Sequence, residues 1–172
     1  NRIAEAAVVR MNMAARAKTY VGFSDCGYLL AALYRAGIGQ SVHGHMPVSA
    51  RSEGGREAIR RVLRWLEGDT SGLEPSLDGT TPAVAFNLIT LAMLAGTPMM
   101  PDLTGHVDMV EEVSEHLYAI DRLFFHLAGT LPRVAGLRLG AVTDVPENYV
   151  EFGQSEEDIA RFWCARAGIP YL

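Results

Sequence analysis

Ser24 is the residue of this sequence most clearly placed to do chemistry. It stands in V-G-F-S-D, between an extended apolar stretch at residues 19 to 23 and a leucine-rich helical stretch that starts at Asp25. A serine at a strand-to-helix turn presents its hydroxyl at the edge of the sheet, and the backbone N–H groups that follow can stabilise an oxyanion. A nucleophile elbow has this arrangement, although the second glycine of its G-x-S-x-G motif is missing here. Taken alone, the position is more typical of a serine that caps a helix.

The histidines offer a second kind of chemistry, metal binding. The sequence has five, at His43, His45, His106, His116 and His126. His43 and His45 flank a glycine, and alternate residues of an extended segment share one face, so this pair could supply two metal ligands. No cysteine or further carboxylate stands near them to complete a site. We therefore expect neither a metal nor another cofactor.

The elements that must position these residues alternate between strand and helix. We expect strands at 19 to 23, 106 to 113 and 134 to 144, and the start of another in Ile169–Leu172. We expect helices at 1 to 17, 25 to 36, 52 to 70, 82 to 96, 117 to 128 and 155 to 168. Such alternation predicts an α/β fold with largely parallel strands. Ligands of these folds gather at the carboxyl ends of the strands, which is where Ser24 stands.

The bulk composition excludes several classes of function. The net charge is −5 and the pI is about 5.5, so no basic face is available for nucleic acid or an anionic membrane. The longest apolar run, residues 82 to 96, is shorter than the roughly 20 residues of a membrane span, and we interpret it as a buried helix. Cys26 and Cys164 lie in helical stretches and are expected to be free thiols, which suits a reducing cytoplasm.

Three motifs occur in a characteristic order between residues 18 and 144. The first is K-T-Y-V-G-F-S-D, followed by a leucine-rich helix and H-G-H-M-P. The second runs from G-T-P-M-M-P-D through M-V-E-E-V-S-E to Y-A-I-D-R, and the third is V-A-G-L-R-L-G-A-V-T-D. Together they resemble the LD-carboxypeptidases of the S66 serine peptidase family. The resemblance implies the second half of a flavodoxin-like or amidotransferase-like nucleophile domain at 1–50, a linker helix and loop at 51–75, and an incomplete swivelling β/α domain at 76–172.

The resemblance also implies a catalytic triad of serine, glutamate and histidine. Ser24 matches the nucleophile, and the backbone N–H of Asp25 matches an oxyanion donor. Glu111, the first acid of M-V-E-E-V, matches the residue that orients the histidine. Glu112 stands where the family usually has aspartate. If the match to the family motif is shifted by one residue, Glu111 and Glu112 exchange roles. The alternative is that both acids form a solvated turn.

Two further residues are expected in the substrate cleft. His43 matches a family loop of the form H-G-P, and Asn87 matches the asparagine of a Gly-Gly-Asn motif. Here Ala85 and Phe86 replace the two glycines. Because these residues disfavour the positive φ angles that glycine allows, we expect this loop to differ from that of the family. The family's usual substrate preference is correspondingly less secure for this protein.

Two parts of the family pattern have no match in this sequence. The triad histidine follows an isoleucine-proline stretch like Ile169-Pro170, and none of the five histidines occupies such a position. A glycine-rich motif that precedes the first helix in the family is not matched either. We therefore expect these 172 residues to be part of a longer enzyme and to be incomplete for catalysis on their own.

The activity implied by the resemblance is cleavage of murein peptides. The protein would release terminal D-alanine from L,D-linked murein tetrapeptides during cell-wall recycling, through an acyl-enzyme. We expect a cytoplasmic homodimer that acts on a muropeptide or another small peptide, without nucleic acid or membrane. Two alternatives stay open. One is an immunity-type peptidase of the same family that cleaves a toxic peptidyl-nucleotide, and the other is a non-catalytic binder of muropeptide fragments.

Overall fold

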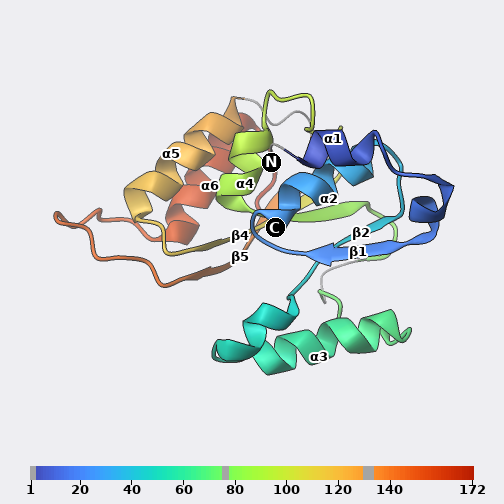
Figure 1. Ribbon diagram of the computed structural model, residues 1–172. Coiled ribbons are helices and arrows are strands. Elements are labelled where there is room, and N and C mark those ends of the chain that lie inside the picture. The colour runs from blue at the N-terminus through green and yellow to red at the C-terminus, as the bar shows by residue number, and fades with distance from the viewer. Residues whose placement is uncertain (1–2, 75–77, 130–133) are drawn as a thin grey trace. The chain divides into compact units, whose positions relative to one another are not determined.

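The computed structural model describes residues 3–74, 78–129 and 134–172, and it divides the chain into two compact units. The first unit is Asn1–Thr80 and the second is Thr81–Leu172. Each contains its own sheet, two-stranded in the first and three-stranded in the second, and all the strand pairs are parallel (Figure 1). The predicted α/β class with parallel strands is therefore confirmed.

The first unit is built around helix α2. Its elements are α1 (Ala4–Val8), β1 (Thr19–Gly22), α2 (Cys26–Arg35), β2 (Gln40–His43) and α3 (Gly55–Leu66), with short 3₁₀ helices at Met13–Ala17, Pro47–Arg51 and Thr70–Gly72. Gly37 ends α2 at a φ of +60°. The Gly37 N–H donates to the Tyr34 carbonyl, and the Ile38 N–H donates to the Leu33 carbonyl. These two bonds form a Schellman cap, which turns the chain from α2 into β2.

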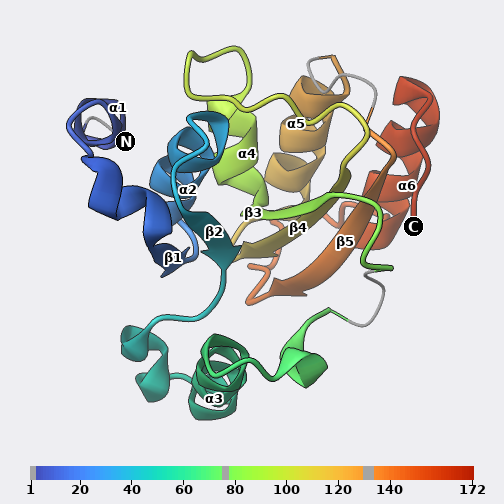
Figure 2. The same ribbon diagram turned by 90° about the vertical axis from the view of Figure 1, so that its right-hand side faces the viewer.

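The second unit is a three-stranded parallel sheet packed against three helices. Its elements are β3 (Ala83–Asn87), α4 (Leu88–Leu94), β4 (Val107–Val113), α5 (Leu117–Ala128), β5 (Gly136–Thr143) and α6 (Glu156–Ala167). The strand order is β3-β4-β5, and α5 packs between α4 and α6 (Figure 2). The core is apolar, and Phe124 and Leu137 are among its fully buried side chains. Because the strands are parallel, their carboxyl ends meet at one edge of this sheet.

The apolar run at 82 to 96 is not the single helix that we expected. Its first part, Ala83–Asn87, is strand β3, and only Leu88–Leu94 is helical. A continuous apolar run has no periodicity that separates a buried strand from a buried helix, which explains the error. Asn87 marks the change, because its side chain accepts a hydrogen bond from the Thr90 N–H at 3.2 Å and caps α4. Among the described residues, no helix is long and apolar enough to cross a membrane.

The same finding corrects the expectation of a variant loop before Asn87. Ala85 and Phe86 lie within β3 and pair with Met109 and Val110 of β4. Phe86 is 5% exposed, so it packs into the core of the second unit. An extended strand needs no positive φ angle, so neither residue is strained there, and phenylalanine is a residue type that strands favour.

The last helix begins and ends as its sequence predicts. Ser155 and Asp158 form a capping box, in which each side chain accepts a hydrogen bond from the other residue's backbone N–H. Gly168 ends α6 at a φ of +70°. Beyond it, Tyr171 forms a parallel bridge with Leu137 at the edge of β5, in agreement with the strand start predicted in Ile169–Leu172.

Candidate active site

Ser24 lies on a strained turn between β1 and α2. Its φ angle is +53°, in the left-handed region that is costly for residues with a side chain. Among the described residues, the only other non-glycine residues with positive φ are Ser114 and Asp144. All three follow within two residues of the end of a parallel strand, β1, β4 and β5 respectively. Strained backbone of this kind gathers at functional sites, and at Ser24 it has the form of a nucleophile elbow.

A close contact between Gly22 and Cys26 makes the turn possible. A β-carbon added to Gly22 would lie 2.6 Å from the β-carbon of Cys26. Cys26 occupies the position of the second glycine in G-x-S-x-G, so its β-carbon fits only because Gly22 has none. The missing second glycine, which weakened the motif in the sequence, is therefore compatible with the elbow conformation.

The cap of α2 is Asp25 and not Ser24. Within the described part of the chain, the Asp25 side chain makes no capping hydrogen bond. The turn is held instead by the backbone, in which the Cys26 N–H donates to the Phe23 carbonyl and the Gly27 N–H donates to the Ser24 carbonyl at 2.8 Å. This arrangement weakens the interpretation of Ser24 as an ordinary helix cap. The role of the Asp25 N–H as an oxyanion donor stays a prediction.

The H-G-H segment lies beside the elbow within the first unit. His43 ends β2 and pairs in register with Gly22 of β1. The ring of His45 lies 5.3 Å from the ring of Phe23, and its Nδ1 is 3.0 Å from the Ser49 hydroxyl. Burial, and to a lesser extent the charge of His45, lowers the pKa of His43 to about 4. At neutral pH His43 is thus an uncharged ring near the nucleophile, which is suitable for lining a cleft.

Glu112 lies in the interior of the second unit. It is 2% exposed. Its carboxylate accepts hydrogen bonds from Asn87 Nδ2 at 2.7 Å, from the Ile89 N–H at 2.9 Å and from the Val113 N–H at 2.9 Å. Three donors satisfy a buried carboxylate that would otherwise be costly. The alternative of a solvated acidic turn is therefore wrong for Glu112.

Glu111 has a different environment at the same end of β4. It is half-buried, and it pairs in register with Asn87 of β3. The pairing with β5 is irregular between Val110 and Glu112, and the absence of a side chain at Gly140 leaves space beside the Glu111 β-carbon. Irregularities of this kind redirect side chains next to active sites. Burial and then the charge of Glu112 raise the pKa of Glu111 to about 7, while a hydrogen bond from Asn87 acts in the opposite direction.

Asn87 is used within the fold. It is 4% exposed, its Oδ1 caps α4, and its Nδ2 donates to Glu112. Direct contact between Asn87 and a substrate stays a prediction, and so does the placement of His43 in the cleft. Within the first unit, His43 pairs in register with Gly22, two residues before Ser24, and within the second unit Asn87 pairs in register with Glu111. Ser24 and Glu111 belong to different units, so their proximity stays a prediction.

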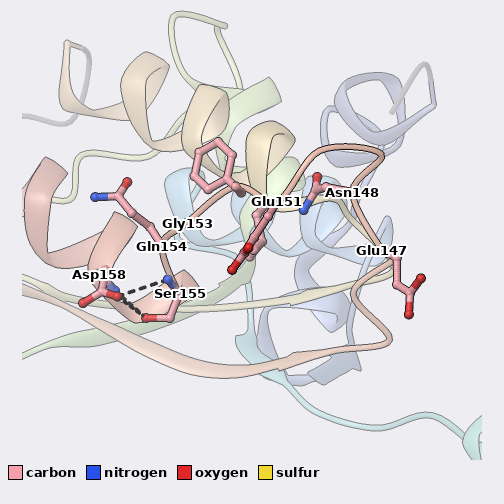
Figure 3. Close-up of a pocket in the computed structure, with 9 residues that line it drawn as sticks. Glu147, Asn148, Glu151, Gly153, Gln154, Ser155 and Asp158 are labelled. Carbon is pink, nitrogen blue, oxygen red and sulfur yellow. Dashed lines mark hydrogen bonds between the residues drawn. The ribbon is translucent and has the colours of Figure 1, made fainter.

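A pocket of about 490 Å³ lies in the second unit, before helix α6 (Figure 3). It is lined by Leu117 of α5 and by side chains between Glu147 and Asp158. The Ser155 hydroxyl donates to Asp158 at the edge of the pocket, at 2.7 Å. None of the predicted site residues lines this pocket. Across residues 3–74, 78–129 and 134–172, no group of three or more His, Cys, Asp or Glu side chains is placed to hold a metal ion.

Comparison with known proteins identifies the family of this fold. Residues 81–172, which are the whole second unit and more than half of the chain, match the model of the LD-carboxypeptidase C-terminal domain. The chain belongs to the LD-carboxypeptidase family. This is a serine peptidase family, so the resemblance found in the sequence motifs is confirmed.

Two carboxypeptidases and one immunity protein illustrate the relationship. The murein tetrapeptide carboxypeptidase of Pseudomonas aeruginosa is 26% identical over 177 residues, covering 91% of this chain and 56% of that protein. The muramoyltetrapeptide carboxypeptidase of Oxalobacter formigenes has 27% identity and a TM-score of 0.70, over 90% of this chain and 57% of its own. The microcin C7 self immunity protein MccF shares the fold at 17% identity, with a TM-score of 0.74 over 98% of this chain and 62% of its own. The chain spans about half the length of the curated relatives it matches.

Proposed function

We propose that the full-length protein is a serine carboxypeptidase that releases terminal D-alanine from L,D-linked murein tetrapeptides in cell-wall recycling. The observation that carries this proposal is the left-handed turn at Ser24, φ +53°, in a chain of the LD-carboxypeptidase family. The two carboxypeptidase relatives at 26% and 27% identity support the substrate class. A residue held in a strained conformation at a strand end is suited to present its hydroxyl to a bound carbonyl.

The proposed mechanism uses the two units together. The Ser24 oxygen attacks the carbonyl carbon that precedes the terminal D-alanine, and its proton passes to an imidazole. The developing oxyanion accepts a hydrogen bond from the Asp25 N–H. The imidazole then protonates the leaving amine, D-alanine departs, and water hydrolyses the acyl-enzyme by the reverse proton transfers. None of the five histidines in this sequence matches the family's base. The proposed imidazole therefore belongs to a histidine of the full-length protein other than these five.

Glu111 is the proposed acid of the triad. Glu112 is the weaker candidate because its carboxylate already accepts three hydrogen bonds inside the second unit. A carboxylate beside a histidine holds the ring in the correct tautomer and stabilises its cation. In return, an imidazolium beside Glu111 would lower the pKa of Glu111 from the raised value set by burial.

Replacement of Ser24 tests the assignment of the nucleophile. In the full-length protein, Ser24→Ala should reduce D-alanine release from an L,D-tetrapeptide by at least about a thousandfold, because the members of a triad act as a unit. Ser71→Ala, at an exposed serine of the same unit, is the matched control and should keep full activity. Near-normal release by Ser24→Ala would remove Ser24 from the mechanism.

The unmutated protein decides between the alternatives. If it releases no D-alanine, a peptidyl-nucleotide substrate would distinguish an immunity-type peptidase, which cleaves it, from a non-catalytic muropeptide binder, which does not.

The proposal also includes a cytoplasmic homodimer in which residues 51–75 link a nucleophile domain to a swivelling domain. Cell fractionation and sedimentation equilibrium test the first two points, and limited proteolysis between the domains tests the third.

A further inference from the structure

A buried pair of side chains connects the ends of two strands next to Glu111. Asn87 is the last residue of β3, and Glu112 is the next-to-last residue of β4. Asn87 Nδ2 donates to Glu112 Oε1 at 2.7 Å. We call this pair the Asn87–Glu112 clamp. Both of its members are less than 5% exposed, so the clamp is not a surface contact.

The clamp is held at both ends by the backbone. The other oxygen of Glu112 accepts from the Ile89 N–H at 2.9 Å, and Oε1 also accepts from the Val113 N–H at 2.9 Å. Asn87 Oδ1 accepts from the Thr90 N–H. The clamp therefore ties the first turn of α4 to the last residues of β4, directly after Glu111. A residue adjacent to such an anchor point has little freedom to turn.

We propose that Glu112 is a positioning residue for Glu111, acting through the clamp to direct the Glu111 carboxyl toward the catalytic histidine and to keep a second negative charge beside it. This inference rests on the proposed function, in which Glu111 is the triad acid. Successive residues of a strand point to opposite faces, so Glu112 inside the unit places Glu111 outward.

Glu112 is the charged neighbour that influences the pKa of Glu111. From β3, Asn87 faces Glu111, and from β5 the neighbouring position is Gly140. Neither carries a charge, and α4 begins with two apolar residues, Leu88 and Ile89. Among the described residues, Glu112 is the charged group that shifts the proton affinity of Glu111. Because a neighbouring negative charge disfavours ionisation, removal of this charge should lower the pKa of Glu111.

The test compares Glu112→Gln with Glu112→Asp in the full-length protein. Glutamine keeps the length of the side chain but removes the charge, whereas aspartate keeps the charge but shortens the reach. Carboxyl carbon NMR should show the titration midpoint of Glu111 moving to lower pH in Glu112→Gln, and changing little in Glu112→Asp. Glu112→Gln should lose about ten- to a hundredfold in kcat with little change in KM, because the Glu111 carboxyl is displaced. Glu112→Asp should lose less, because it keeps a carboxylate that can still accept hydrogen bonds.

Asp108→Asn is the matched control. It removes another buried carboxyl from the same strand, four residues away, and Asp108 has no described hydrogen-bond partner that its loss would disturb. It should leave the titration of Glu111 and kcat unchanged. Circular dichroism of each variant at the assay temperature establishes that it is folded before activity is compared.

Three outcomes would overturn the inference or its basis. If Glu112→Gln leaves the titration of Glu111 unmoved, Glu112 does not set its environment. If Glu112→Gln is folded and keeps full kcat, the clamp does not position Glu111. Where Glu112→Gln does not fold, a folded Glu112→Ala with full kcat gives the same answer. If Glu111→Gln is fully active, the triad assignment itself fails, and that result is independent of any change at Glu112.

Discussion

Cys26 packs directly against Gly22, so closely that a β-carbon on Gly22 would lie 2.6 Å from the β-carbon of Cys26. The contact brings the start of α2 against the end of β1, and Ser24 lies in the turn between these two residues. The left-handed conformation of Ser24 depends on this approach of two backbone segments. Both ends of the contact can be tested by substitution.

Gly22→Ala should destabilise the first unit by about 1–3 kcal/mol, because the added methyl group overlaps Cys26. Urea unfolding followed by the fluorescence of Trp65, in a Trp163→Phe background, measures the change. Cys26→Gly should recover much of the loss, whereas Cys26→Ala should not, since alanine keeps the β-carbon. A Gly22→Ala variant as stable as the parent would contradict the close packing.

Ser24→Gly should be more stable than Ser24→Ala by about 1 kcal/mol. Alanine at this position keeps the penalty of a left-handed conformation, and glycine does not. Both variants lack the hydroxyl and should be equally inactive, so the comparison separates backbone strain from chemistry. Differential scanning calorimetry of the two proteins at one pH provides the measurement. Equal stability would argue against strain at Ser24.

Asp108→Asn should stabilise the second unit at pH 8 and have little effect at pH 4. Asp108 is fully buried, and among the residues that the structure describes neither of its carboxyl oxygens has a hydrogen-bond partner. Burial raises its pKa to about 7, above the ordinary value. A raised pKa favours the neutral form in the folded state, so its stabilising contribution is complete below about pH 4 and is lost as the pH rises through about 7.

The expected gain at pH 8 is on the order of 4 kcal/mol, since the pKa of Asp108 rises from 3.8 to about 7, each pH unit corresponds to about 1.4 kcal/mol, and asparagine is neutral at every pH. Urea unfolding of both proteins across pH 4 to 8 gives the difference directly. The raised pKa of Glu111 makes stability depend on pH with the same sign, so Asp108→Asn should reduce, but not abolish, the fall of the free energy of unfolding between pH 4 and 8. If the free energy of unfolding falls as steeply in Asp108→Asn as in the parent, Asp108 gains a partner when it ionises.

The indole of Trp163 donates a hydrogen bond to Asp121 at 2.7 Å and joins α6 to α5. A double-mutant cycle of Asp121→Ala with Trp163→Phe should give a coupling energy of about 1–2 kcal/mol. Asp121→Asn is the conservative control, because its side-chain oxygen can still accept the bond. A coupling energy near zero would mean that the packing of the two helices does not depend on this bond.

Local signals made several features of this protein predictable from its sequence. The capping box of Ser155 and Asp158, the glycine that ends α6 and the turn at Ser24 each depend on residues within four positions of one another. Caps and turns are satisfied by neighbours in the chain, so their residue types reveal them. The family motifs were recognisable for the same reason, since each is a short run of adjacent residues.

Tertiary contacts decided the features that local sequence left open. Residues 82 to 96 divide into β3 and α4 because Ala83–Asn87 finds a partner in β4, some twenty residues later. Glu111 and Glu112 are adjacent and chemically alike, yet Glu112 is the one that is buried with Asn87, 25 residues away, whereas Glu111 is only half-buried. Strand pairing and the burial of a charge depend on groups distant in sequence. A pattern of adjacent residues does not identify which distant group will form the contact.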